Sequence, residues 1–189
     1  MGLVGWIVVG VLVLAALYAV IIYNRLVRLR ALVKEGFSGI IVQLRRRADL
    51  IPNLVSTVEG YATHEREVLT EVTAHRADAT KARGVAETAQ ADNAFSAMLG
   101  RLMAVAEAYP DLKADDNFRQ LQEELSEIEE HLQSARRYYN ATVRDLNTRI
   151  QSFPDVLLAR PMGFSEEESY TDDVAAISAA PVVKFGAKA

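Results

Sequence analysis

The feature that most constrains this chain is a run of 22 residues, positions 2–23, that contains no charged side chain. As an α-helix this run would be about 33 Å long, which matches the roughly 30 Å hydrocarbon core of a bilayer. Trp6 lies near one end of the run, and Tyr18 and Tyr23 lie near the other, as in the aromatic belts of membrane helices. The rest of the chain is too small to bury such a helix on every side. The run therefore predicts a transmembrane anchor over residues 1–24.

A cleaved signal peptide is the competing interpretation of this run. Signal peptides begin with basic residues, have an apolar core of about 7–15 residues and end in a small-residue cleavage motif. Here no Lys or Arg precedes the run, the run is longer, and no clean cleavage motif follows it. We therefore expect an uncleaved anchor.

The formal net charge of −4 conceals an uneven distribution of charge along the chain. Residues 25–48 carry seven basic residues and one acidic residue, whereas the chain from residue 49 onward carries 14 basic and 24 acidic residues. Because Lys and Arg concentrate on the cytoplasmic side of membrane helices, we predict a single-pass protein with its N-terminus outside and its body in the cytoplasm. In a bacterium the anchor would lie in the inner (cell) membrane. A body with a net charge of −10 is a poor partner for nucleic acid.

Two clusters of basic residues follow the apolar run. The first, which we name the basic collar, consists of Arg25, Arg28, Arg30 and Lys34. The collar lies within about 15 Å of the run by helical rise, so we expect it to contact anionic lipid head groups. The second cluster consists of Arg45, Arg46 and Arg47. Two alternatives are open for this second cluster: salt bridges to an acidic helix later in the chain, or contact with anionic lipid or a partner protein.

Apolar residues after the run recur every three or four positions, which predicts helices throughout the body. The first helix would continue from the anchor, with a kink or break near Pro52 and a restart capped by Asp49. A second helix is predicted over residues 85–108 and a third over residues 116–153. Apolar positions in the third helix alternate in steps of three and four, typical of a coiled coil, apart from one irregular step at Tyr139.

The predicted fold class is all-α, with an N-terminal transmembrane helix that runs into an elongated antiparallel three-helix bundle or coiled coil. The bundle would occupy residues 25–160, and a C-terminal tail would occupy residues 161–189. We expect Asp115 or Asp116 to cap the third helix. The end of the tail is either mobile or forms a short strand over residues 181–185 that docks on a neighbouring copy.

The sequence lacks the residue patterns that support catalysis or a cofactor. There are no cysteines, which excludes disulfides, thiolate metal sites and cysteine nucleophiles. His64 and His75 are three helical turns apart, too far along the axis to share a metal ion. No glycine-rich phosphate loop and no nucleophile–base pair stands out. We therefore predict that the protein is not an enzyme and has no catalytic residues, metal site or cofactor.

Several short motifs occur in order along residues 1–170. The early ones are Tyr-Asn-Arg-Leu-Val at 23–27, Val-Gln-Leu-Arg-Arg-Arg-Ala-Asp-Leu-Ile-Pro-Asn-Leu-Val at 42–55 and Gly-Tyr-Ala-Thr-His-Glu at 60–65. The later ones are Tyr-Pro-Asp-Leu-Lys-Ala at 109–114, Asn-Phe at 117–118, Ala-Arg-Arg-Tyr-Tyr-Asn at 135–140, Phe-Pro at 153–154 and Gly-Phe at 163–164. Together these motifs resemble the signature of the LemA family. Phe37, Leu146 and Tyr170 depart from the family pattern, and each exchanges one large side chain for another.

We predict structural roles for the motif residues. Arg47, Asp49 and Asn53 surround Pro52 and would satisfy the backbone groups that this proline leaves without a partner. The other motif residues would fix the hairpin before the third helix, mark its irregular step or close it: Tyr109, Pro110, Asp111, Phe118, Tyr139, Asn140, Phe153 and Pro154.

The resemblance implies a bacterial, single-span protein with a helical body and no established enzymatic activity. Magnetosome-associated relatives of this family imply a link to membrane shape or organisation. Two functions are therefore open. The first is a membrane-anchored scaffold that forms homo-oligomers and organises or remodels the membrane, because its helices carry more apolar surface than one copy can bury. The second is an adaptor whose acidic body binds a membrane sensor or a protease partner.

Overall fold

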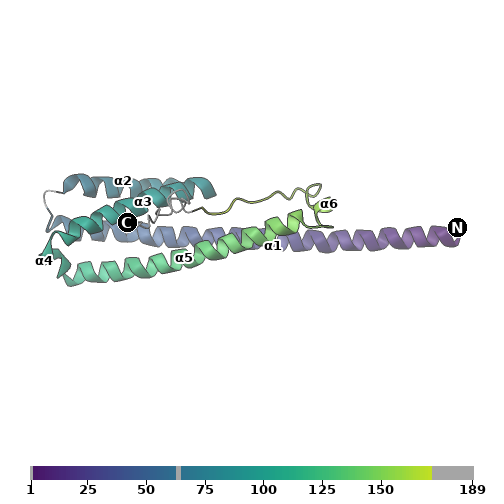
Figure 1. The fold of residues 1–189 in the computed structure, drawn as a ribbon, viewed down its shortest axis with the longest axis horizontal. Coiled ribbons are helices and arrows are strands. Elements are labelled where there is room, and N and C mark those ends of the chain that lie inside the picture. Colours follow the sequence, from purple (N-terminus) through teal and green to yellow (C-terminus); the bar gives the residue numbers. More distant parts are fainter. Residues whose placement is uncertain (1, 63–64, 172–189) are drawn as a thin grey trace, which may run out of the picture.

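A computed structural model describes residues 2–62 and 65–171 of the 189-residue chain (Figure 1). These residues form six helices and no strand, so the predicted all-α fold class is confirmed. The helices are α1 (Leu3–Glu59), α2 (Arg66–Lys81), α3 (Val85–Glu107), α4 (Pro110–Lys113), α5 (Asp116–Gln151) and α6 (Val156–Ala159).

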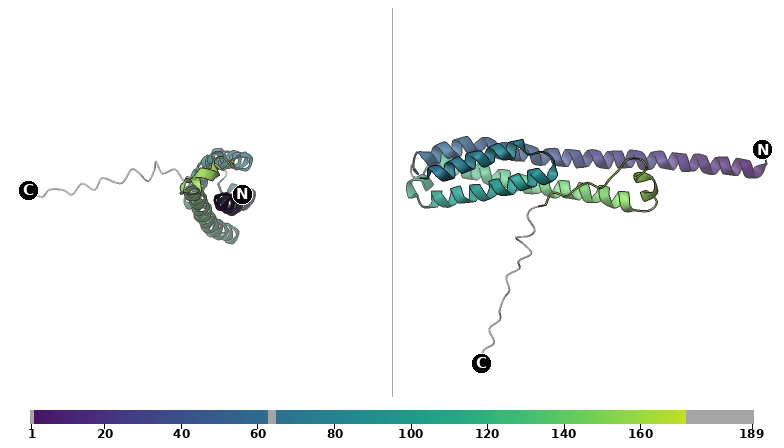
Figure 2. Two further views of the ribbon diagram at one scale, coloured as in Figure 1. Left: turned by 90° about the vertical axis from the view of Figure 1, so that its right-hand side faces the viewer. Right: turned by 90° about the horizontal axis from the view of Figure 1, so that it is seen from above.

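The 57-residue helix α1 is the axis of the molecule. Its N-terminal part projects alone, α5 packs antiparallel along the rest of it, and α2 and α3 form a hairpin beside its C-terminal half (Figure 2). The first buried side chain along α1 is Ile22. The apolar run thus continues directly into the packed body, as the sequence predicted.

The prediction of a break at Pro52 is wrong, because α1 passes through this residue as one continuous helix. A proline has no N–H to donate to the carbonyl four residues earlier, here that of Ala48. In the structure the Arg76 guanidinium on α2 supplies the missing donor, with 2.6 Å between its Nε and the Ala48 oxygen. A long-range hydrogen bond thus takes the place of the helical one.

The residues predicted to repair the Pro52 position do not do so. Asp49 lies inside α1 and caps no restart, and its carboxylate is 3.9 Å from the Arg76 guanidinium. Arg47 turns into the core, and Asn53 is exposed. The first bundle helix ends later than the predicted break, at Glu59, so four long helices replace the predicted three.

Replacement of Arg76 by alanine should lower the free energy of unfolding by about 1–2 kcal/mol, since a buried carbonyl loses a charged donor. Pro52→Ala restores a backbone N–H at position 52, which can donate to the Ala48 carbonyl. In that background, Arg76→Ala should therefore cost about 1 kcal/mol less than in the native chain. Denaturant unfolding of the four proteins in the double-mutant cycle measures this difference. Equal costs in both backgrounds would contradict the role assigned to Arg76.

The predicted bounds of the later helices agree closely with α3 and α5. Asp115 caps α5 as predicted, because its carboxylate accepts a hydrogen bond from the Phe118 N–H at 2.9 Å. The Tyr61 hydroxyl donates to the same carboxylate at 3.0 Å, which ties the end of α1 to the start of α5. The Phe118 N–H and the Tyr61 hydroxyl both hold the pKa of Asp115 below its usual value.

The buried residues form two hydrophobic clusters along the long axis. One joins α1 and α5 beside the projecting part of α1 and contains Ile22 and Tyr139, and the other joins α1, α2, α3 and α5 at the far end around Phe95. Gly36 faces α5, and a Cβ atom there would be 3.1 Å from the Tyr139 Cα, closer than most Cβ contacts. A larger residue at this position would require the two helices to shift by a few tenths of an ångström.

Candidate functional site: an exposed apolar helix and a buried ionic cluster

The N-terminal third of α1 is the most unusual surface of the molecule. No residue from Leu3 to Ile21 is buried, and the large side chains among them, including Trp6, are exposed. Among the described residues, α1 is the one helix that is long and apolar enough to cross a membrane. An exposed, charge-free helix of this length is unstable in water and suits a lipid environment.

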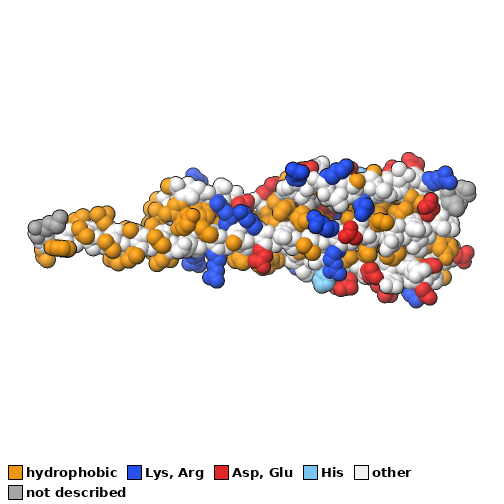
Figure 3. All heavy atoms as spheres, turned by 180° about the vertical axis from the view of Figure 1, so that it is seen from behind, with side chains coloured by type: hydrophobic (Ala, Val, Ile, Leu, Met, Phe, Trp, Pro, Cys, Tyr) orange, Lys and Arg blue, Asp and Glu red, His pale blue; other side chains and the backbone are white. Residues whose placement is uncertain are grey.

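The basic collar follows this surface. Figure 3 shows Lys and Arg side chains gathered around the junction between the apolar helix and the body. Arg25, Arg28 and Lys34 are exposed on α1. Arg30 differs, since its guanidinium donates to the Gly163 carbonyl at 2.9 Å and lies 4.4 Å from the centre of the Phe164 ring. Three of the four predicted lipid contacts are therefore open to solvent, whereas Arg30 binds the protein.

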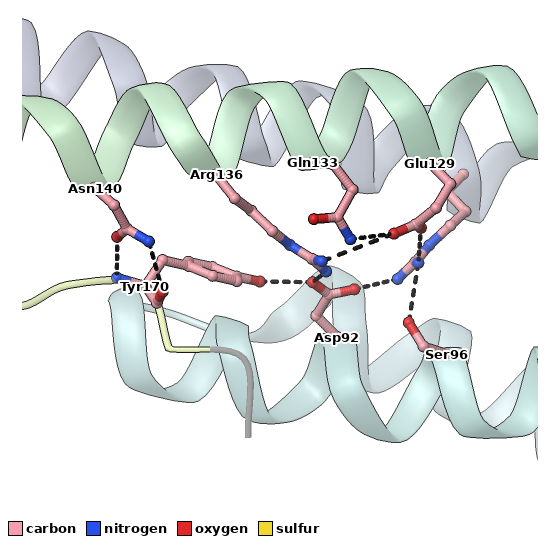
Figure 4. A network of polar contacts seen from close by, with 8 residues as sticks. Asp92, Ser96, Glu129, Gln133, Arg136, Asn140 and Tyr170 are labelled. Carbon is pink, nitrogen blue, oxygen red and sulfur yellow. Dashed lines mark hydrogen bonds and ion pairs between the residues drawn. The ribbon is translucent and has the colours of Figure 1, made fainter. Parts of the chain in front are cut away.

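A buried ionic cluster lies at the centre of the body, around Asp92 of α3 (Figure 4). The Asp92 side chain is 0% exposed. One carboxylate oxygen pairs with Arg47 of α1, and the other pairs with Arg136 of α5 and accepts a hydrogen bond from the Tyr170 hydroxyl at 2.7 Å. One side chain therefore links three helices and the C-terminal segment.

Glu129 of α5 completes the charge balance of the cluster. Its carboxylate is 3.1 Å from the Arg47 guanidinium and 3.7 Å from that of Arg136. Ser96 accepts a further hydrogen bond from Arg47 at 3.1 Å, and Gln133 donates to Glu129 at 2.9 Å. Two arginines thus face two carboxylates, and both oxygens of Asp92 are occupied by neighbouring side chains. Such a closed arrangement ties helices together and leaves the Asp92 carboxylate engaged rather than poised for chemistry.

The three residues of the second basic cluster, Arg45, Arg46 and Arg47, differ in their surroundings. Arg47 forms the salt bridge to α5 that one of the two alternatives anticipated, through Glu129, but its buried partner is Asp92 on α3. Arg45 and Arg46 are exposed, and Arg46 bonds Gln43 within its own helix at 3.4 Å.

The segment after α6 forms a strap along α5, which we define as residues 163–171. Asn147 exchanges two hydrogen bonds with the backbone of Glu167, at 2.8 and 2.9 Å. Asn140 does the same with the backbone of Tyr170, at 3.0 and 2.8 Å. The Tyr139 hydroxyl donates to the Glu168 carbonyl at 2.7 Å. Paired amide bonds of this kind hold an irregular segment in one register.

The strap overlaps the first part of the predicted C-terminal tail, residues 161–189. Its first described residues lack helical structure, as the sequence indicated, but they are bound to α5 and bury Phe164 and Tyr170. The proposed strand at 181–185 lies outside the described residues.

Raising the pH above 10 should release the strap. Burial raises the pKa of Tyr139 from 10.0 to about 12, with a smaller contribution from Glu167. Burial, followed by the charge of Asp92, also raises the pKa of Tyr170 well above its usual value. Because the folded state favours the neutral phenols, their stabilising effect is complete below pH 10, and the contribution of Tyr139 is lost as pH rises through about 12.

The tyrosinate absorbance of the protein, followed during a pH titration, measures this behaviour. The Tyr139 phenol should ionise near pH 12, together with a loss of helical signal. Tyr139→Phe should remove the absorbance step near pH 12. Ionisation of all seven tyrosines in one transition near pH 10 would contradict the assignment.

A groove of about 850 Å³ runs between α3 and α5, beside the ionic cluster. Leu99, Met103 and Leu125 contribute apolar surface to it. Acidic side chains of α5, among them Glu123 and Glu127, also line the groove and give it negative charge. The groove therefore suits an apolar segment that carries basic residues.

The remaining residues singled out from the sequence lie at the two ends of the bundle. At the far end of the bundle, Tyr109 is half-buried, Pro110 begins α4, Asp111 is exposed and Phe118 is buried. At the opposite end, nearest the projecting part of α1, Phe153 and Pro154 follow the end of α5, and the Phe153 ring is exposed. Over the described ranges, 2–62 and 65–171, no group of three or more His, Asp or Glu residues could hold a metal ion.

Sequence reasoning missed Asp92 and Arg136, which lie at the centre of the ionic cluster, and Arg76, which bonds the Ala48 carbonyl near Pro52. A usable signal existed for the first two, because each falls in the apolar stripe of its helix. Asp92 precedes the buried Phe95 by three positions, and Arg136 lies four after the buried Leu132. A charged residue inside an apolar stripe is buried and paired in most folds.

Comparison with known proteins identifies what this chain resembles. The sequence pattern that describes the LemA family matches residues 36–185. Magnetosome protein MamQ 2 of Paramagnetospirillum magneticum is 26% identical over 193 residues, which cover 87% of this chain and 71% of that protein. MamQ of Magnetospirillum gryphiswaldense is 26% identical, with 78% of this chain and 64% of that protein covered. Protein LemA of Metamycoplasma hominis is 28% identical over 135 residues, with 69% and 60% covered.

Proposed function

Because this chain belongs to the LemA family, we propose that it is a membrane-anchored helical scaffold that self-assembles in the membrane plane and organises or remodels the bacterial inner membrane. The observation that carries the proposal is the continuity of α1, whose exposed apolar part and packed part form one helix. Relatives named as magnetosome proteins support an association with membranes. None of the names of these relatives denotes a reaction, which favours a structural role over a catalytic one.

Self-assembly is supported by apolar side chains that remain exposed on the body beyond the apolar run. Val27 and Val42 of α1 and Tyr138 of α5 are each more than two-fifths exposed. Surfaces of this kind are buried when copies anchored in one bilayer pack side by side. Membrane anchoring favours this contact, because it confines the copies to two dimensions with parallel axes.

Imaging of the full-length protein in lipid vesicles tests the scaffold function. Arrays or rings on the vesicle surface, with altered vesicle curvature, are the expected result. Glutamate at positions 42 and 138 should disperse these assemblies without loss of helix content, because both side chains are exposed. A strictly monomeric protein that leaves vesicles unchanged would refute the proposal.

The topology we propose places the N-terminus outside and the body in the cytoplasm, on the basis of the basic collar. The chain has no cysteine, so a single introduced cysteine reports its location without a background signal. Gly2→Cys should react with a membrane-impermeant maleimide in intact spheroplasts, whereas Ser126→Cys on α5 should react only after lysis. The reverse pattern would overturn the topology and leave the anchor intact.

An adaptor that binds a membrane sensor or a protease is the second candidate function, and the groove between α3 and α5 favours it. The apolar surface of Leu99 and Met103 beside acidic side chains suits a basic amphipathic helix of such a partner. A photo-crosslinker at position 103 should capture one specific partner in cells. Loss of this product in a Leu99→Glu variant would favour the adaptor, and crosslinks between copies alone would favour the scaffold.

A further inference from the structure

The turn between α5 and α6 exposes large apolar side chains at the end of the body that faces the apolar run. Phe153 is 81% exposed and Leu157 is 63% exposed. Phe153 is at least as exposed as any large apolar side chain on the projecting part of α1, where Leu3 reaches 79%, and Leu157 matches Leu12 at 64%. Leu157 lies on the four-residue helix α6, and Phe153 lies in the turn that leads into it. Large apolar side chains that are exposed together are more stable in an apolar environment than in water.

This turn lies level with the end of the apolar run. Ile22 belongs to the charge-free run, yet it is 1% exposed because it is in one hydrophobic cluster with Ala159 of α6 and with Phe164. The ring centres of Tyr23 and Phe164 are 5.8 Å apart. In Figure 2 the α6 turn is the part of the body closest to the N-terminus. If residues 3–21 cross a hydrocarbon core of about 30 Å, the turn lies at the lipid interface.

The charges around the turn suit an anionic lipid surface. Arg160 is exposed directly after α6, and Arg25 and Arg28 are exposed on the neighbouring part of α1. The single carboxylate between residues 149 and 164, that of Asp155, is 1% exposed and paired with Arg149. No exposed carboxylate on this turn therefore opposes contact with lipid phosphates.

We propose that Phe153 and Leu157 insert into the lipid interface, so that the body contacts the bilayer at a second site beside the span. The partner is an anionic membrane surface, which receives the two apolar side chains in its acyl boundary and binds Arg160, Arg25 and Arg28 at its phosphates. The inference rests on the proposed anchor, because α1 brings the turn to the bilayer. A helix alone leaves rotation and tilt of the body free, whereas a second contact beside it fixes both.

Fluorescence quenching by brominated lipid tests the inference in the full-length protein. Trp6 is the single tryptophan, so Trp6→Phe provides a background in which one new tryptophan reports its own surroundings. Four proteins are compared: Phe153→Trp, Leu157→Trp, Leu12→Trp within the span, and Tyr138→Trp as the matched control. Tyr138 is exposed on the same helix that leads to the turn, but lies four turns earlier. Each protein is reconstituted in vesicles of phosphatidylglycerol and brominated phosphatidylcholine.

Tryptophan at positions 153, 157 and 12 should lose about half of its emission or more, because interfacial side chains lie about 5–10 Å deep, within reach of the bromine atoms. Tryptophan at position 138 should keep its emission. If position 12 is quenched and positions 153 and 157 behave like 138, the inference is overturned and the anchor stands. An unquenched but blue-shifted signal at 153 would place it in a protein contact and also overturn the inference. If position 12 itself is unquenched, the proposed anchor fails as well.

Discussion

Replacement of Asp92 by alanine should lower the free energy of unfolding by about 3–5 kcal/mol, the largest effect of any single substitution outside the hydrophobic clusters. The substitution leaves Arg47 and Arg136 buried with Glu129 as their shared carboxylate, and it removes the acceptor of the Tyr170 hydroxyl. An uncompensated buried charge costs more than the contact that it loses. Denaturant unfolding of the full-length protein in detergent, followed by helical signal, measures the effect.

Two further variants separate charge imbalance from loss of packing. Asp145→Ala removes an exposed carboxylate from α5 and should change stability by no more than about 0.5 kcal/mol. The double variant Asp92→Leu with Arg136→Met leaves Arg47 paired with Glu129, so it should be less destabilised than Asp92→Ala alone. If Asp92→Ala and Asp145→Ala lowered the free energy of unfolding by the same amount, the ionic cluster would not stabilise the fold.

Removal of residues 1–18 should release the protein from the membrane completely while the body stays folded. The removed part of α1 contains no buried residue, so the hydrophobic clusters remain whole. The shortened chain should appear in the soluble fraction after lysis, with the unfolding midpoint of the body unchanged. The α6 turn alone is too small an apolar surface to retain the protein stably.

A second truncation, of residues 1–26, provides the comparison. It also removes Ile22 and Leu26, which are buried against α6 and the strap. Loss of buried Leu or Ile side chains costs about 2–5 kcal/mol each, so this chain should be markedly less stable than the first. If the first truncation remained in the membrane fraction after a high-salt wash, the anchor would be refuted. If both truncations were equally stable, the packing of Ile22 would be refuted.

The helices could be predicted from the sequence because each buries one stripe at a regular spacing. The buried positions of α5 follow steps of three and four, as predicted. The irregular step is not at Tyr139 but at Leu132, where two steps of four join Ile128, Leu132 and Arg136. Capping by Asp115 was likewise predictable, because a cap depends on residues within one turn. Helical periodicity and helix caps depend only on residues that are close in sequence. The all-α fold class could therefore be predicted from the sequence.

The Pro52 position and the strap could not be predicted, because both depend on partners distant in sequence. The helix continues through Pro52 with the help of Arg76, which lies 28 positions from the carbonyl that it bonds. The strap is held by amides at positions 140 and 147, and each pairs with a backbone that has no periodic pattern of its own. The buried ionic cluster could not be predicted for the same reason. Its charged residues lie on three different helices and come together only in the folded chain.

The continuity of α1 would also make the anchored protein a spacer of defined height. From Ile22, beside the proposed lipid contact, to Glu59 at its far end, the helix rises by about 55 Å. With the proposed anchor in a bilayer, the acidic start of α5 and the hairpin at α4 would be held at that height above it, beyond the reach of its surface potential, which decays over about 8–10 Å. Neighbouring copies would present these ends in one plane, and a second membrane or a large complex could approach no closer than that distance.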